Sequence, residues 1–99
     1  MKASSPLPVE HSFPTGSHGT TLVLMVCAGW LWAGLYASPH SATPTEVSAA
    51  TGRTAAVRGR QLRIGAGHYS LSQKSLQAAR RWLDRQGVTV RDQTPKETA

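Results

Sequence analysis

The chain has 99 residues, which is room for at most one ordinary domain. Its 11 Lys and Arg exceed its 5 Asp and Glu, and the net charge of +6 suits anionic lipid, nucleic acid or an acidic protein partner. Cys27 is the only cysteine, which excludes an internal disulfide and a CxxC metal site, and the absence of Asn excludes N-glycosylation.

The N-terminal segment, residues 1–19, is short and rich in residues that form turns. It contains Pro6, Pro8 and Pro14, with Gly residues close to its end. Such punctuation is typical of a segment without regular structure. We therefore expect residues 1–19 to be disordered.

Residues 20–37 form an uncharged stretch, TTLVLMVCAGWLWAGLYA, whose 18 residues are long enough for a membrane-spanning helix. Trp30, Trp32 and Tyr36 gather near its C-terminal end, where an aromatic belt would meet the lipid headgroups. A helix in a water-soluble core would show a polar stripe, and this stretch has none. The sequence therefore predicts a single-pass transmembrane α-helix with disordered flanks.

A cleaved secretory signal is the alternative for this stretch. Such a signal needs a basic beginning, an apolar centre and small residues before the cleavage site. The segment before the stretch carries only Lys2, and the best cleavage point, near Ala37, has Leu35 where a small residue is required. We favour the uncleaved anchor over a secreted precursor.

The stretch also has features that predict contacts within a membrane. Gly29, Ala33 and Ala37 recur every four residues, so in a helix they would form a helix-pairing face that lets a second membrane helix approach closely. The expected partners are therefore membrane lipid and another membrane protein or a second copy. The Lys and Arg of residues 58–99 favour a cytoplasmic C-terminus.

Residues 38–59 resemble a flexible linker, because Ser, Thr, Ala and Pro dominate them. Residues 60–91 have the pattern of a small β-α-β-like or amphipathic-helix unit. The alternating QLRIGA at residues 61–66 predicts one short strand, and the alternating VTVR at residues 88–91 predicts another. Residues 92–99 are expected to be a disordered tail.

A helix over residues 70–86 is the element with the strongest pattern. Ser70 is placed to cap its first turn, and Gly87 to end it. The helix would be basic and amphipathic, and a unit of about 35 residues is too small to fold without a covering partner. The residues predicted to contact a membrane or a partner are Leu76, Arg80, Arg81, Trp82, Leu83 and Arg85.

The same region resembles two known families. IGAGHYSLSQKSLQAARRWLDRQGVTV has the strand–GxGxx–helix–strand order of a dinucleotide-binding fingerprint, with Ser70 at the third glycine position. LRIGAG and AARRWLDRQGVTV within it are similar to the opening strand–helix–strand of the SPOR domain, a peptidoglycan-binding βαββαβ module. The similarity covers about a third of the chain and lacks the second half-repeat. It implies a further alternative, an envelope protein with a truncated SPOR-like unit.

No arrangement of residues predicts catalysis. The four histidines lack metal-ligand spacing, and the carboxylates form no evident acid–base pair. We therefore expect no enzyme activity, no cofactor and no metal. Nucleic acid is disfavoured as a partner because Trp82 is the only aromatic residue among the helix arginines. The sequence predicts a small membrane protein that acts as an interaction or accessory subunit of a membrane complex.

Overall fold

The computed structural model describes residues 9–16, 19–27 and 29–93, and this part of the chain contains eight strands and one helix. In chain order these are β1 (Val9–Pro14), β2 (Thr21–Cys27), β3 (Trp30–Tyr36), β4 (Glu46–Thr51), β5 (Thr54–Arg58), β6 (Gln61–Ile64), β7 (Gly67–Ser70), α1 (Gln73–Arg85) and β8 (Thr89–Asp92).

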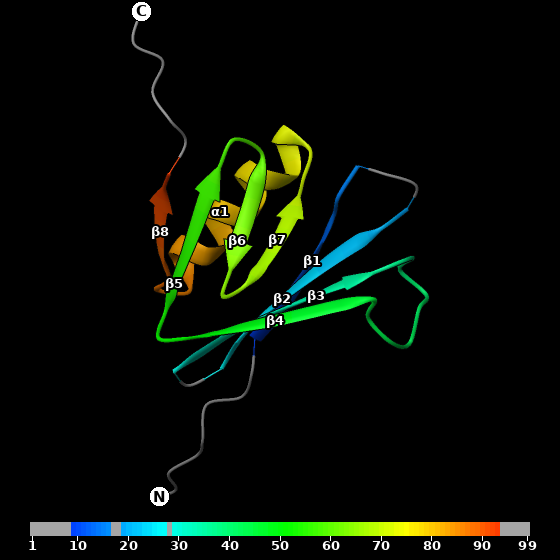
Figure 1. Ribbon diagram of the computed structural model, residues 1–99, viewed down its shortest axis with the longest axis horizontal. Helices are drawn as coiled ribbons and strands as arrows, with labels where there is room; N and C mark the ends of the chain where they lie inside the picture. Colours follow the sequence, from blue (N-terminus) through cyan, green and yellow to red (C-terminus); the bar gives the residue numbers. More distant parts are fainter. Residues whose placement is uncertain (1–8, 17–18, 28, 94–99) are drawn as a thin grey trace, which may run out of the picture.

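The strands form two sheets of four strands each (Figure 1). Sheet A is an antiparallel meander in the order β1-β2-β3-β4. Sheet B has the order β7-β6-β5-β8, in which β8 is parallel to β5 and the other pairs are antiparallel. The strands of sheet A run across those of sheet B, and α1 covers one face of sheet B. The fold is therefore mostly β-structure.

The prediction of a transmembrane helix over residues 20–37 is wrong, because this stretch forms the β2–β3 hairpin. Leu22 pairs with Leu35 and Met25 with Trp32 across the hairpin, and Gly29 adopts a positive φ of 76° between the strands. Among the residues that the structure describes, no helix is long and apolar enough to cross a bilayer. The predicted single-pass membrane location and cytoplasmic C-terminus depended on that helix and are corrected with it.

The reason for this error lies in the position of the hairpin within sheet A. Strands β2 and β3 are the two central strands, and apolar residues occupy both of their faces. Central strands of this kind give a nearly continuous apolar run, which periodicity alone does not distinguish from a buried helix. The alternation appears only in the burial, since Leu22, Leu24 and Val26 are buried while the residues between them are half-exposed.

The expected disordered flanks are also corrected. Strand β1 lies within the segment 1–19, and β4 and β5 lie within the expected linker 38–59. Residues 1–8, 17–18 and 94–99, over which disorder was predicted as well, lie outside the described residues.

One hydrophobic core joins the inner face of sheet A, the inner face of sheet B and the apolar side of α1. A fully buried Leu or Val side chain contributes roughly 1.5–3 kcal/mol to folding. Cleavage near Ala37 would remove β1, β2 and β3. The core would then lose Phe13, Leu22, Leu24, Val26, Leu31 and Ala33. The largest fully buried side chains are Tyr69, Leu22, Leu24, Leu31, Leu62, Ile64, Leu83 and Val57.

Two local contacts connect the sheets. The Tyr69 hydroxyl of β7 lies 2.6 Å from Oγ of Ser48 in β4. In the β6–β7 turn, Gly65 has a positive φ of 58°, and a Cβ at this position would collide with the backbone carbonyl of Ala49. A glycine is therefore required where the turn of sheet B meets the backbone of β4.

Helix α1 begins at Gln73, three residues later than predicted. Ser72 is its N-cap, with an Oγ that accepts a hydrogen bond from the Ser75 backbone N–H at 3.3 Å. Ser70, the predicted cap, instead ends β7. Strand β7 therefore includes Ser70, the first residue of the predicted helix.

Candidate functional site

The face of sheet B opposite α1, here called the basic face, is open to solvent. Successive side chains of a strand point to opposite faces, and the buried residues of β5, β6 and β7 mark the side that faces the core. The alternate positions define the basic face: Thr54, Ala56, Arg58, Gln61, Arg63, His68, Ser70, Thr89 and Arg91. This set contains three arginines, one histidine and no carboxylate.

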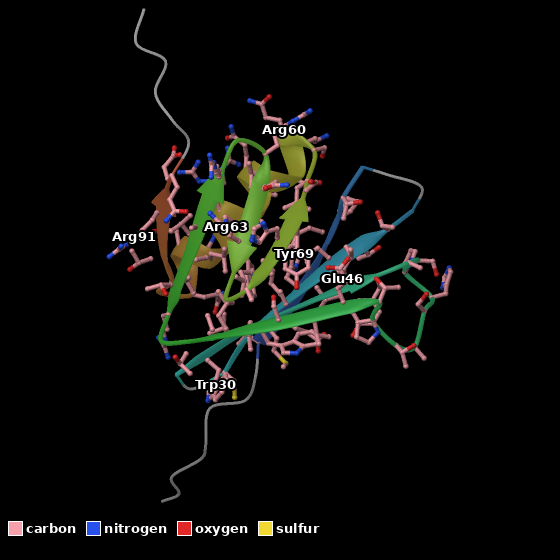
Figure 2. The ribbon with its side chains drawn as sticks, viewed as in Figure 1. Trp30, Glu46, Arg60, Arg63, Tyr69 and Arg91 are labelled. Atoms are coloured by element: carbon pink, nitrogen blue, oxygen red, sulfur yellow. The ribbon has the colours of Figure 1, made fainter. Side chains whose placement is uncertain are left out.

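A row of four residues crosses the basic face in register. His68 pairs with Arg63, Arg63 pairs with Ala56, and Ala56 pairs with Arg91. Neighbouring strands lie about 4.8 Å apart, so the backbones of Arg63 and Arg91 are separated by about 10 Å, with only the Ala56 methyl group between them. Figure 2 shows Arg63 over the middle of sheet B and Arg91 at its β8 edge. Arg63, Ala56 and Arg91 line the same open groove, and the gap between the two arginines can admit an anion.

An open groove follows this gap to the junction with sheet A. Thr54, Arg63, Arg91 and Gln93 supply its polar side chains, and the other lining residues are Ala and Gly. The lining residues are Ala50, Thr54, Ala55, Ala56, Arg63, Gly65, Arg91 and Gln93.

The Arg63 side chain is held in place by neutral partners. Its guanidinium donates one hydrogen bond to Oε1 of Gln93 at 3.3 Å and another to Nε2 of His68 at 3.4 Å. Arg63 is half-buried, whereas Arg58 and Arg91 are exposed. Because these two partners are not carboxylates, they orient the guanidinium without neutralising it, and the positive charge is available to an external anion.

The charge is divided between the two halves of the chain. Residues 53–93 hold nine Lys and Arg against Asp84 and Asp92, whereas residues 9–51 hold Glu10 and Glu46 and no Lys or Arg. The positive potential is therefore concentrated on sheet B and α1, and sheet A contributes none of it.

The six residues predicted to contact a membrane or a partner separate into two groups. Leu76, Trp82 and Leu83 are buried in the core, where the Trp82 ring lies 6.1 Å from those of His11 and Phe13 in β1. The fold therefore covers the apolar side of α1 with its own strands, and a bilayer is not needed for that purpose. The other group, Arg80, Arg81 and Arg85, is exposed on the outer side of α1.

The predicted helix-pairing residues Gly29, Ala33 and Ala37 do not share a face. Gly29 lies in the β2–β3 turn, Ala33 is buried in β3, and Ala37 is exposed after the end of β3. Their spacing of four residues aligns side chains only in a helix. The structure does not bring them together.

Sequence reasoning missed the three arginines of the basic face. The alternation of QLRI does contain a signal, because Arg63 stands between two apolar residues and must face away from them. The pairing of β5 with β8, which brings Arg91 beside Ala56, joins strands separated by more than thirty residues and leaves no local signal.

Metal sites and relatives offer no further guidance. Over residues 9–16, 19–27 and 29–93, no group of three or more His, Cys, Asp and Glu could hold a metal ion. The absence of enzyme activity remains a prediction. Comparison of the chain with protein-family models, curated proteins and solved structures finds no match.

Proposed function

We propose that the protein binds nucleic acid through the basic face of sheet B, by contacts to the phosphate backbone. The observation that carries this proposal is the row in which Arg63 and Arg91 flank Ala56, without a carboxylate on the face. A guanidinium group presents two parallel N–H donors, which match two oxygens of a phosphate group. Two such groups beside an open groove form a binding site for adjacent phosphates.

The shape of the face favours a polymer over a small anion. The four strands place His68 and Arg91 about 14 Å apart at opposite edges, and the face between them is an open surface. An extended chain of phosphates can reach Arg58, Arg63 and Arg91 together. Lipid is a poorer match, because the basic face has no large apolar side chain that would enter a bilayer.

The expected binding does not depend on base sequence. The basic face carries no Phe, Tyr or Trp on which bases could stack, and Trp82 is buried. Contacts to phosphate give affinity without base readout. Duplex DNA carries about one charge per 1.7 Å, twice the density of a single strand, so duplex should bind at least as tightly. This proposal departs from the sequence prediction of an accessory subunit of a membrane complex, for which nucleic acid was disfavoured as a partner. It keeps only the role in an interaction.

Fluorescence anisotropy with a labelled duplex of mixed sequence tests the proposal. Three arginines at phosphates predict a slope of about −2.7 for the logarithm of the association constant against the logarithm of salt concentration. The double variant R63E/R91E should bind at least about tenfold more weakly and lower this slope by about 2. Far-UV circular dichroism and thermal unfolding check that the variant is folded.

The matched control is R80E/R81E, which makes the same change in net charge on the outer side of α1. It should weaken binding by less than about threefold, because screening limits charges more than about 10 Å from the ligand. Equal weakening by both variants would mean attraction by net charge alone and would contradict a site on sheet B. Tighter binding to a poly-glutamate peptide than to the duplex would also contradict the proposal.

A further inference from the structure

Sheet A has an open face of opposite character, here called the apolar face. It lies on the side of sheet A away from sheet B, where Figure 2 shows Trp30. Trp30 is 52% exposed and Val47 57% exposed. By the register of the four strands, the apolar face has a centre of Val23, Met25, Cys27, Trp30, Trp32, Gly34, Tyr36, Val47 and Ala49. Its margins are Glu10, Ser12, Pro14, Thr21 and Thr51.

The centre of the apolar face is flat. Trp32 and Gly34 occupy successive outward positions of β3, and a Cβ built at Gly34 would come within 3.0 Å of Cζ2 and Cζ3 of Trp32. The indole therefore lies along the strand, over the position where a side chain is missing. An aromatic ring that covers a strand glycine in this way gives a smooth surface that a second flat sheet can contact.

We propose that the apolar face binds the apolar face of a second copy and forms a symmetric dimer. Charge supports this occupant, because residues 9–51 contain no Lys or Arg. A dimer formed through sheet A places the two basic halves on opposite outer sides. Packed sheets are about 10 Å apart, so several layers separate the basic faces by more than the Debye length of about 8–10 Å. An anionic membrane is a poorer occupant, since no basic residue from this half would meet its headgroups.

The area is sufficient for a specific contact. Four strands about 4.8 Å apart and about seven residues long give a face of roughly 19 by 23 Å, or about 440 Å² in projection. Two such faces bury about 900 Å² in projection, and the relief of the side chains increases that value. This area lies at the lower end of specific protein interfaces, for which a dissociation constant on the order of micromolar is expected.

Sedimentation velocity of the full chain between about 1 and 200 µM, a range chosen around the expected micromolar constant, tests the dimer. The wild-type protein should shift from monomer to dimer across this range. W30K and V47K each place a charge in the interface, and each should raise the dissociation constant at least about 30-fold. Both side chains are more than half exposed, so their replacement leaves the core intact.

A78K is the matched control, because it adds the same charge at an exposed position of α1 outside the apolar face. It should dimerise like the wild type. Cys27 gives a second readout, since it is half-buried on the apolar face and a dimer would cover it. Its reaction with a maleimide should slow as wild-type concentration rises, and this dependence should be lost in W30K.

Three results would overturn the inference. These are a wild-type monomer at 200 µM, equal dissociation by A78K and W30K, and Trp30-dependent binding of the monomer to phosphatidylcholine vesicles, which would make the face a lipid contact. None of them affects the nucleic-acid proposal. A monomeric W30K that still binds duplex would separate the two claims.

Discussion

The contact between Tyr69 and Ser48 predicts a measurable coupling between the two sheets. Tyr69 is 1% exposed, and its hydroxyl has Oγ of Ser48 at 2.6 Å. Ser48→Ala leaves a buried hydroxyl unpaired and should lower the free energy of unfolding by about 1–3 kcal/mol. Tyr69→Phe removes the hydroxyl itself and leaves a half-exposed serine that water can reach, so its cost should be about 0.5–1.5 kcal/mol.

The double variant should cost less than the sum of the single variants, by about 1 kcal/mol, because the second replacement removes the unpaired group left by the first. Equilibrium unfolding in urea measures all three values, and for a domain of this size about 1 kcal/mol corresponds to a shift of 4–8 °C in Tm. Ser12→Ala, on the far side of sheet A, is the control and should be additive with Tyr69→Phe. Additivity of Ser48→Ala with Tyr69→Phe within about 0.3 kcal/mol would refute the packing of sheet A on sheet B described here.

Two further predictions concern strand β2 and the start of helix α1. Leu24→Ala should lower the free energy of unfolding by about 2–5 kcal/mol, because Leu24 is fully buried. Met25→Ala, measured in dilute protein, should lower it by about 1 kcal/mol or less, because Met25 is half-exposed. Similar costs for the two variants would argue against a strand. Ser72→Ala should cost about 1 kcal/mol through the lost helix cap, and Ser70→Ala less than about 0.5 kcal/mol; the reverse order in urea unfolding would place the cap at Ser70.

The local patterns of residues 61–91 contain more of the fold than the rest of the sequence. The alternation around Leu62 and the amphipathic spacing up to Leu83 lie where the structure has β6 and α1. Both patterns arise because each element buries one side and exposes the other. What the sequence did not show is the cover for α1, because that cover comes from β1 and sheet B, which are remote in the chain.

Sheet A could not be recognised from the same kind of pattern. Its central strands have apolar residues on both faces, so the alternation that marks a half-exposed strand is absent. Gly29, which the spacing predicts as part of a helix-pairing face, has a positive φ and lies in the hairpin turn. Residues 20–37 were therefore assigned to a membrane helix because the outward side of β2 and β3 is also apolar. This gives the stretch the composition of a membrane span.

The candidate site was hidden for a different reason. Arg63 and Arg91 belong to strands that do not pair with each other, and Ala56 lies between them only because β5 lies between β6 and β8. A parallel pairing between distant segments depends on the topology of the whole sheet. Composition could indicate a basic protein, but it could not indicate which arginines share a face.

A nuclear magnetic resonance titration with duplex DNA would locate the proposed nucleic-acid contact on the basic face of sheet B. Amide and arginine side-chain signals of the ¹⁵N-labelled protein would be followed as duplex is added at low salt. We expect the largest shifts at Arg58, Arg63 and Arg91, together with their neighbours on β5, β6 and β8. Largest shifts at Arg80, Arg81 and Arg85 on α1, or no shifts at all, would contradict it.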